Sequence, residues 1–112
     1  MQTTARAVVI GGGVVGCSVL YHLAKFGWTD SVLLERDELT SGSTWHAAGG
    51  MHTINGDPNV AKLQQYSINL YKEIEEISGQ SVGLHMTEGL MLAATPARYE
   101  WLKSIHSKGR YM

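Results

Sequence analysis

The sequence is short of cysteine, of surplus charge and of long apolar runs. Its single cysteine, Cys17, excludes an internal disulfide, so nothing indicates an oxidising compartment. Nine basic residues stand against ten acidic ones, and the formal net charge of −1 gives no electrostatic footprint for nucleic acid or an anionic membrane. No apolar stretch reaches the ~18 residues that a membrane span needs. We therefore expect neither a nucleic acid partner nor a membrane-spanning segment.

Residues that could bind a metal are also few and scattered. None of the five histidines pairs at a ligand spacing such as H-x-x-x-H, and one cysteine cannot form a thiolate cluster, so we expect no metal site. The first six residues lead almost directly into an apolar run, which leaves no room for a signal or transit peptide. We expect a cytoplasmic location, or the mitochondrial matrix if a transit peptide has been removed.

What the sequence does have is a glycine-rich turn near its start. The apolar run Ala7–Ile10 gives way to the spacing G-x-G-x-x-G at Gly11, Gly13 and Gly16, and a helical pattern begins at Val14. In a dinucleotide-binding turn, the first glycine permits the bend and the second lets backbone N–H groups approach a pyrophosphate. The third lets the helix pack close to the strand. The helix N-terminus adds unpaired N–H donors. The spacing alone also fits an ordinary glycine turn.

The residues after the turn favour the dinucleotide-binding interpretation. The helical pattern covers Val14–Phe26 and stops at Gly27, and Ser31–Glu35 is typical of a second buried strand that ends on a carboxylate. Glu35 follows Gly11 by 24 positions, close to the ~20 expected for the acid that binds a ribose hydroxyl. A glutamate that merely faces solvent is the alternative. In this order, the elements predict a βαβ unit that binds a dinucleotide.

The next segment, 36–56, has the periodicity of neither a helix nor a strand. Structureless stretches of this length are uncommon inside a compact domain and are usually functional or disordered. The tryptophan and small apolar residues in Ser41–Gly50 do not have a disordered composition. They suit a segment that lies closely over a large flat ligand, bulkier than a nicotinamide. His46 lies within this segment, and composition alone also allows it simply to pack there.

The second half of the chain predicts two helices with a hairpin between them. Asp57 and Thr95 are good N-cap residues, and each precedes one of the two prolines at the first helical position. The first of these helices should end at Gly79. The segments 82–86 and 89–93 predict two short strands in a hairpin. A complete dinucleotide-binding sheet needs more strands than this, so we interpret residues 1–112 as the N-terminal piece of a larger protein.

Three segments together resemble the dimethylglycine/sarcosine dehydrogenase family, which consists of flavoproteins of the D-amino-acid-oxidase-like superfamily. They are the turn Gly11–Gly16, Leu33–Arg36 and Ser41–Gly49. The resemblance covers nearly the whole chain and implies an α/β fold. The chain would be the N-terminal part of a Rossmann-like FAD-binding domain, with a βαβ start, a parallel sheet, a helix and a short β-hairpin insertion. It implies FAD contacts at Gly11, Gly13, Val14, Val15, Gly16, Glu35, Arg36, Ser43, Thr44, His46, Ala48 and Gly49.

In that family the histidine of the Ser41–Gly49 stretch carries FAD covalently, and this histidine corresponds to His46. The implied reaction is oxidative demethylation of an N-methylated amino acid such as dimethylglycine or sarcosine. Tetrahydrofolate could take the one-carbon unit through a C-terminal domain that this chain lacks. The piece alone should be inactive. Two alternatives stay open: a catalytically silent regulatory homologue that acts as a protein partner, and an amino-acid oxidase with non-covalent FAD.

Overall fold

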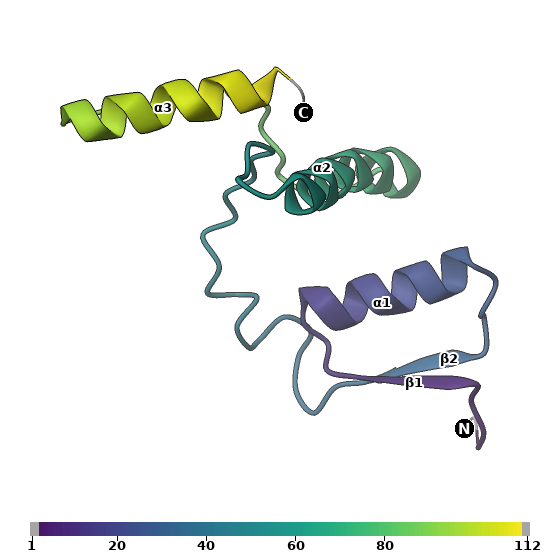
Figure 1. Ribbon diagram of the computed structural model, residues 1–112. Helices are drawn as coiled ribbons and strands as arrows, with labels where there is room; N and C mark the ends of the chain where they lie inside the picture. Colours follow the sequence, from purple (N-terminus) through teal and green to yellow (C-terminus); the bar gives the residue numbers. More distant parts are fainter. Residues whose placement is uncertain (1–2, 111–112) are drawn as a thin grey trace. The chain divides into compact units, whose positions relative to one another are not determined.

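A computed structural model describes residues 3–110 of the chain. Contacts divide the chain into two compact units between Gly49 and Gly50 (Figure 1). We describe each unit by itself.

The first unit is a βαβ unit. Strand β1 (Ala7–Ile10) leads into helix α1 (Val14–Lys25), and the chain returns in strand β2 (Ser31–Leu34). The strands pair in parallel, in a register that sets Ala7 opposite Ser31 and Ile10 opposite Leu34. Helix α1 contacts both strands and lies along one face of the sheet (Figure 1). The predicted strand–helix–strand order and the α/β class are confirmed.

Helix α1 ends where the sequence places its stop signal. Gly27 has φ +85°, a left-handed conformation that favours glycine. The N–H of Trp28 donates to the carbonyl of Leu23 at 2.8 Å, and that of Gly27 donates to Ala24 at 2.9 Å. These bonds satisfy carbonyls that the end of a helix would otherwise leave without donors.

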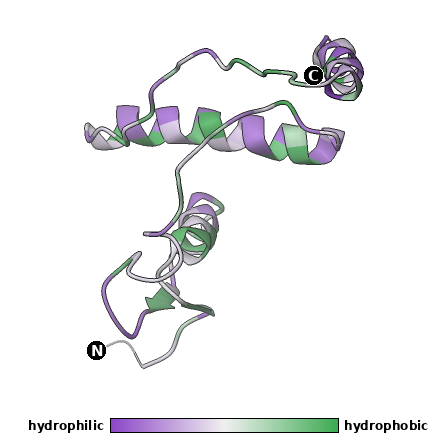
Figure 2. Cartoon of the chain, turned by 90° about the vertical axis from the view of Figure 1, so that its left-hand side faces the viewer, coloured by the Kyte–Doolittle hydropathy of each residue, from purple (hydrophilic) through white to green (hydrophobic). Residues whose placement is uncertain are grey.

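The second unit contains two helices, α2 (Pro58–Ser78) and α3 (Pro96–Gly109). The side chain of Asp57 accepts the N–H groups of Asn59 and Val60, and that of Thr95 accepts the N–H of Arg98. Both predicted helix starts are therefore confirmed, because the caps satisfy N–H groups that have no partner within the helix. Helix α2 carries hydrophobic and hydrophilic residues along its length (Figure 2). None of the helices among residues 3–110 combines the length and apolar character that crossing a membrane would require.

The predicted hairpin between these helices is wrong. Segments 82–86 and 89–93 form no strand, and residues 79–93 contain no helix either. Gly83 adopts φ +69° in the middle of the first expected strand, which breaks its extended conformation. The N–H of Thr87 donates to the carbonyl of His85 two residues earlier, at 3.0 Å, so the chain turns tightly before the expected hairpin loop. Two short apolar segments around a turn are not enough here, because an isolated two-stranded hairpin is only marginally stable.

Candidate cofactor-binding site

The glycine turn between β1 and α1 has the geometry that its spacing predicts. Gly11 has φ +105°, which a residue with a side chain rarely adopts, and its N–H donates to the carbonyl of Leu34 at 2.8 Å. A Cβ added to Gly16 would overlap the carbonyl oxygen of Gly11 and come within 3.5 Å of Val9 Cγ1. Gly11 therefore makes the bend, and Gly16 lets the first turn of α1 lie directly against the end of β1.

The N-terminus of α1 offers backbone donors to an anion. Among the described residues, no hydrogen bond engages the N–H groups of Gly13, Val15 or Gly16. Gly13 is the N-cap residue and has no side chain that could cap the helix itself. Free N–H groups and the positive end of the helix dipole suit a phosphate or pyrophosphate. The residues at this turn thus fit the phosphate part of a dinucleotide.

The carboxylate of Glu35 is held by three backbone N–H groups. Its Oε2 accepts the N–H of Gly12 at 2.6 Å, and its Oε1 accepts those of Arg36 at 2.7 Å and Asp37 at 3.1 Å. These bonds, with that of Gly12 first, lower the pKa of Glu35 from the ordinary value of 4.5, because they stabilise the charged form. Glu35 is therefore an ionised acceptor at neutral pH, joined directly to the glycine turn.

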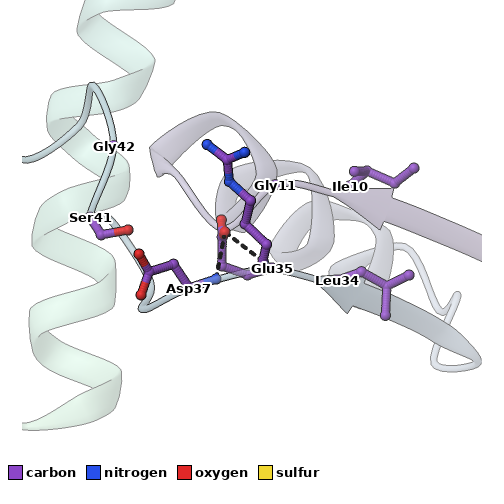
Figure 3. A pocket seen from close by; sticks show the side chains of 8 residues that line it. Ile10, Gly11, Leu34, Glu35, Asp37, Ser41 and Gly42 are labelled. Atoms are coloured by element: carbon purple, nitrogen blue, oxygen red, sulfur yellow. Dashed lines mark hydrogen bonds between the residues drawn. The ribbon is translucent and has the colours of Figure 1, made fainter.

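A pocket of about 420 Å³ lies beside this carboxylate. Figure 3 shows the strand residues Ile10 and Leu34 on one side of it and Asp37 and Ser41 on the other. Its lining consists of the carboxyl ends of both parallel strands and the loop after β2: Ile10, Gly11, Leu34, Glu35, Arg36, Asp37, Ser41 and Gly42. Ligands of α/β sheets bind outside the carboxyl ends of their strands, so this pocket has the position expected of a nucleotide site.

The loop after β2 returns to the glycine turn. The N–H of Thr40 donates to the carbonyl of Gly12 at 3.0 Å, and the N–H of Val14 donates to Thr44 Oγ1 at 2.9 Å. A Cβ on Gly12 would lie 2.6 Å from Leu39 Cδ2 and 3.1 Å from Glu35 Cβ, so both side chains pack closely against the turn. Residues 39–44 thus lie against the turn, and Thr44 caps the helix in place of Gly13.

His46 lies two residues beyond this cap, in a run of turns. Its N–H donates to the carbonyl of Ser43 at 3.2 Å, and its Nδ1 lies 3.1 Å from the carbonyl oxygen of Gly42. A carbonyl can only accept, so in the neutral ring Nδ1 carries the hydrogen of this bond and Nε2 keeps its lone pair. The imidazole is exposed and stands edge-on to Trp45, with ring centroids 6.1 Å apart.

The structure brings together only part of the predicted site. Gly11, Glu35 and Arg36 line the pocket, and Val14 bonds to Thr44. The other nine predicted residues do not line this pocket: Gly13, Val14, Val15, Gly16, Ser43, Thr44, His46, Ala48 and Gly49. Sequence reasoning missed the Gly12 N–H that binds Glu35 and the pocket residues of the following loop: Asp37, Ser41 and Gly42. Gly12 could have been found because it is the middle glycine of the turn. Nothing in the sequence marks Asp37, Ser41 or Gly42 individually.

No group of three or more histidine, cysteine, aspartate or glutamate side chains suited to a metal ion occurs within residues 3–110.

A glycine turn, an exposed helix N-terminus and a carboxylate at the end of the second strand define a dinucleotide-binding βαβ unit. The sequence profile of the family described as "FAD dependent oxidoreductase" (DAO) matches residues 6–111. The chain belongs to this DAO family of flavoproteins, in which the dinucleotide is FAD.

Known relatives agree with this family. Dimethylglycine dehydrogenase, mitochondrial, from Homo sapiens is 50% identical over 99 residues, which are 88% of this chain and 11% of that protein. Sarcosine dehydrogenase, mitochondrial, from Homo sapiens is 41% identical over 111 residues, 98% of this chain and 12% of that protein. The pyruvate dehydrogenase phosphatase regulatory subunit, mitochondrial, from Mus musculus is 41% identical over 108 residues, 96% of this chain and 12% of that protein. The chain thus spans 11–12% of the length of these relatives.

Proposed function

We propose that residues 1–112 are the N-terminal part of the FAD-binding domain of a longer oxidoreductase that demethylates an N-methylated amino acid, such as dimethylglycine or sarcosine. The main support for FAD binding is the position of Glu35. Its carboxylate is hydrogen-bonded to the glycine turn and lies beside the pocket at the strand ends. The substrate class is supported by the names of two dehydrogenases that are 50% identical over 99 residues and 41% identical over 111 residues. Their names also support a mitochondrial location.

In this proposal each part of the site binds one part of FAD. The free N–H groups of Gly13, Val15 and Gly16 bind the pyrophosphate, since they are the unpaired donors of the helix N-terminus. Glu35 accepts from the adenosine ribose hydroxyls, because a carboxylate oxygen can accept more than one hydrogen bond. Arg36 and the pocket at the strand ends hold the adenosine around it.

The loop beyond Thr44 serves the flavin end. We assign covalent attachment to Nε2 of His46, because the contact of Nδ1 with Gly42 directs the hydrogen to Nδ1 and leaves Nε2 nucleophilic. Nε2 would form a bond to a ring methyl carbon of oxidised FAD as that methyl group loses a proton, and Nδ1 would then release its own hydrogen as a proton. The electron pair of the broken C–H bond would pass to the flavin ring, from which dioxygen or another electron acceptor would remove it. The small residues Ala48 and Gly49, with Ser43, let the backbone approach a flat ring. The bound flavin would accept a hydride from the N-methyl carbon of the substrate. Transfer of the one-carbon unit to tetrahydrofolate would depend on residues outside this chain.

The test uses the full-length protein and two histidine variants. After acid denaturation, we expect flavin fluorescence on the wild-type protein band and a flavin-modified peptide that contains His46. His46→Ala should lose the covalent flavin but still bind FAD, because the turn and Glu35 remain. His106→Ala is the matched control, since His106 is an exposed residue of α3 and should keep the covalent flavin. Flavin released entirely into the supernatant of the wild type, or attached to another residue, would refute the assignment.

A second candidate is a regulatory homologue without catalytic activity. The observation that favours it is the 41% identity to a phosphatase regulatory subunit over 96% of this chain. Purification separates the two: a yellow protein that oxidises N-methylated amino acids supports the enzyme, and a colourless protein that binds another protein supports the regulator. A yellow protein whose flavin is fully released by denaturation would instead indicate an oxidase with non-covalent FAD.

A further inference from the structure

The bond between Thr44 and α1 links two parts of the chain that are 30 residues apart in sequence. The N–H of Val14 donates to Thr44 Oγ1 at 2.9 Å. An N-cap side chain normally comes from the residue at the start of the helix. Here Gly13 holds that place without a side chain, and the position of its missing Cβ lies 3.0 Å from Thr44 Oγ1. The helix start is thus shaped to receive an oxygen from the distant loop.

Thr44 also belongs to the turn that carries His46. The carbonyl of Thr44 accepts the N–H of Ala47 at 3.2 Å, and the carbonyl of Thr40 accepts the N–H of Trp45 at 3.1 Å. The N–H of His46 is bonded to Ser43 in the same turn. Because short-range bonds hold this turn together, fixing the side chain of Thr44 also fixes the backbone from which the imidazole of His46 projects.

We propose that Thr44 is a positioning residue for covalent attachment of the flavin. Its hydroxyl oxygen anchors the His46 turn to the N-terminus of α1, where the pyrophosphate of the same cofactor binds. One helix start then sets both the position of the cofactor and that of the nucleophile. This inference rests on the covalent attachment at His46 proposed above and adds the residue that controls its rate.

Loss of the anchor should slow attachment more than it weakens binding. The reaction of a bound group depends on alignment, and a misplacement of about 1 Å can cost roughly a hundredfold in rate. Thr44→Val removes the accepting oxygen and keeps the branched shape of the side chain. Thr44→Ser keeps the oxygen and loses only the methyl group. Thr29→Val is the matched control, because Thr29 is an exposed residue between α1 and β2.

The experiment uses the full-length protein prepared without flavin and mixed with FAD at a series of concentrations. Samples are quenched in acid, and fluorescence of protein-bound flavin gives a limiting attachment rate and the FAD concentration for half the maximal rate. We expect Thr44→Val to lower the limiting rate by about ten- to a hundredfold. Its half-maximal FAD concentration should change much less. Thr44→Ser and Thr29→Val should stay close to the wild type.

Three results would overturn the inference: an unchanged limiting rate in Thr44→Val, a change confined to the half-maximal FAD concentration, or equal slowing by Thr29→Val. If Thr44→Val does not fold or bind FAD, Thr44→Ala is used instead, with the same expectation. A wild type without flavin on His46 would refute the proposed attachment itself. A wild type with that flavin and a Thr44→Val variant with an unchanged limiting attachment rate would refute only the role of Thr44.

Discussion

The two units of the chain are organised by different kinds of contact. In the first unit, the side chain of Glu35 bonds to a residue 23 positions earlier, and Thr44 bonds to one 30 positions earlier. In the second unit, Asp57 and Thr95 cap their helices within three residues. Short-range signals are sufficient to begin a helix, whereas the candidate cofactor site exists only where distant residues meet. Mutations should therefore affect FAD binding in the first unit and mainly helix stability in the second.

The largest expected effect comes from comparing one helical glycine in each unit. Gly16→Ala would drive a Cβ into the carbonyl of Gly11, and relief requires a backbone shift at the glycine turn. We expect a loss of at least about 3 kcal/mol in unfolding free energy and loss of bound FAD. Gly109→Ala in α3 meets nothing within 4 Å and should leave both unchanged. Calorimetry of the full-length protein measures the unfolding free energy, and its flavin content measures FAD binding. Normal FAD content in Gly16→Ala would contradict the prediction.

A smaller effect is expected at the two glycines that end helices in the left-handed conformation. Gly27 has φ +85° after α1 and Gly79 has φ +67° after α2, so alanine at either should cost about 1–2 kcal/mol. Hydrogen exchange of the preceding helix measures this cost. Gly27→Ala should also reduce FAD retention, because α1 carries the phosphate site, whereas Gly79→Ala should not. Gly89→Ala, with no positive φ and no atom within 4 Å, is the control. If Gly27→Ala and Gly79→Ala reduced FAD retention equally, the claim that only the first unit supports FAD binding would be wrong.

The cap of α2 should contribute still less, and only locally. Asp57 accepts the N–H groups of Asn59 at 2.7 Å and Val60 at 3.2 Å. Asp57→Ala should cost about 1 kcal/mol, seen as faster hydrogen exchange in the first turn of α2. Asp57→Asn, which also caps well, should largely preserve protection. FAD content should not change in either variant, and a loss of FAD would show that this cap supports the cofactor site.

The smallest effect is expected from acid. The pKa of Glu35 is lowered in the folded protein by its bonds to Gly12, Asp37 and Arg36, so its contribution to stability is fully present above the ordinary value of 4.5. It is lost progressively as the pH falls from that value through the lowered folded-state pKa. The difference in stability between the wild type and Glu35→Gln should stay constant from pH 7 to that ordinary value and shrink below it. A difference that already shrinks at mildly acidic pH would contradict this pKa shift.

The sequence by itself determined the elements that depend on neighbouring residues. Asp57 and Thr95 before prolines fixed the starts of α2 and α3, and Gly27 fixed the end of α1. The glycine spacing and the carboxylate at position 35 also predicted the βαβ order and its cofactor class. The helix-end signals act within one turn, and the glycine spacing with Glu35 is a known pattern of one βαβ unit, so both can be interpreted without knowing the rest of the structure.

Only the tertiary structure decided which distant groups meet. The sequence does not indicate that Gly12 donates to Glu35, or that Thr44 replaces the missing cap of Gly13, because these contacts cross 23 and 30 residues of chain. The failed hairpin at 82–93 has the same cause. Strands are stable only when a partner strand supplies their hydrogen bonds, and a short apolar segment does not show whether such a partner is present.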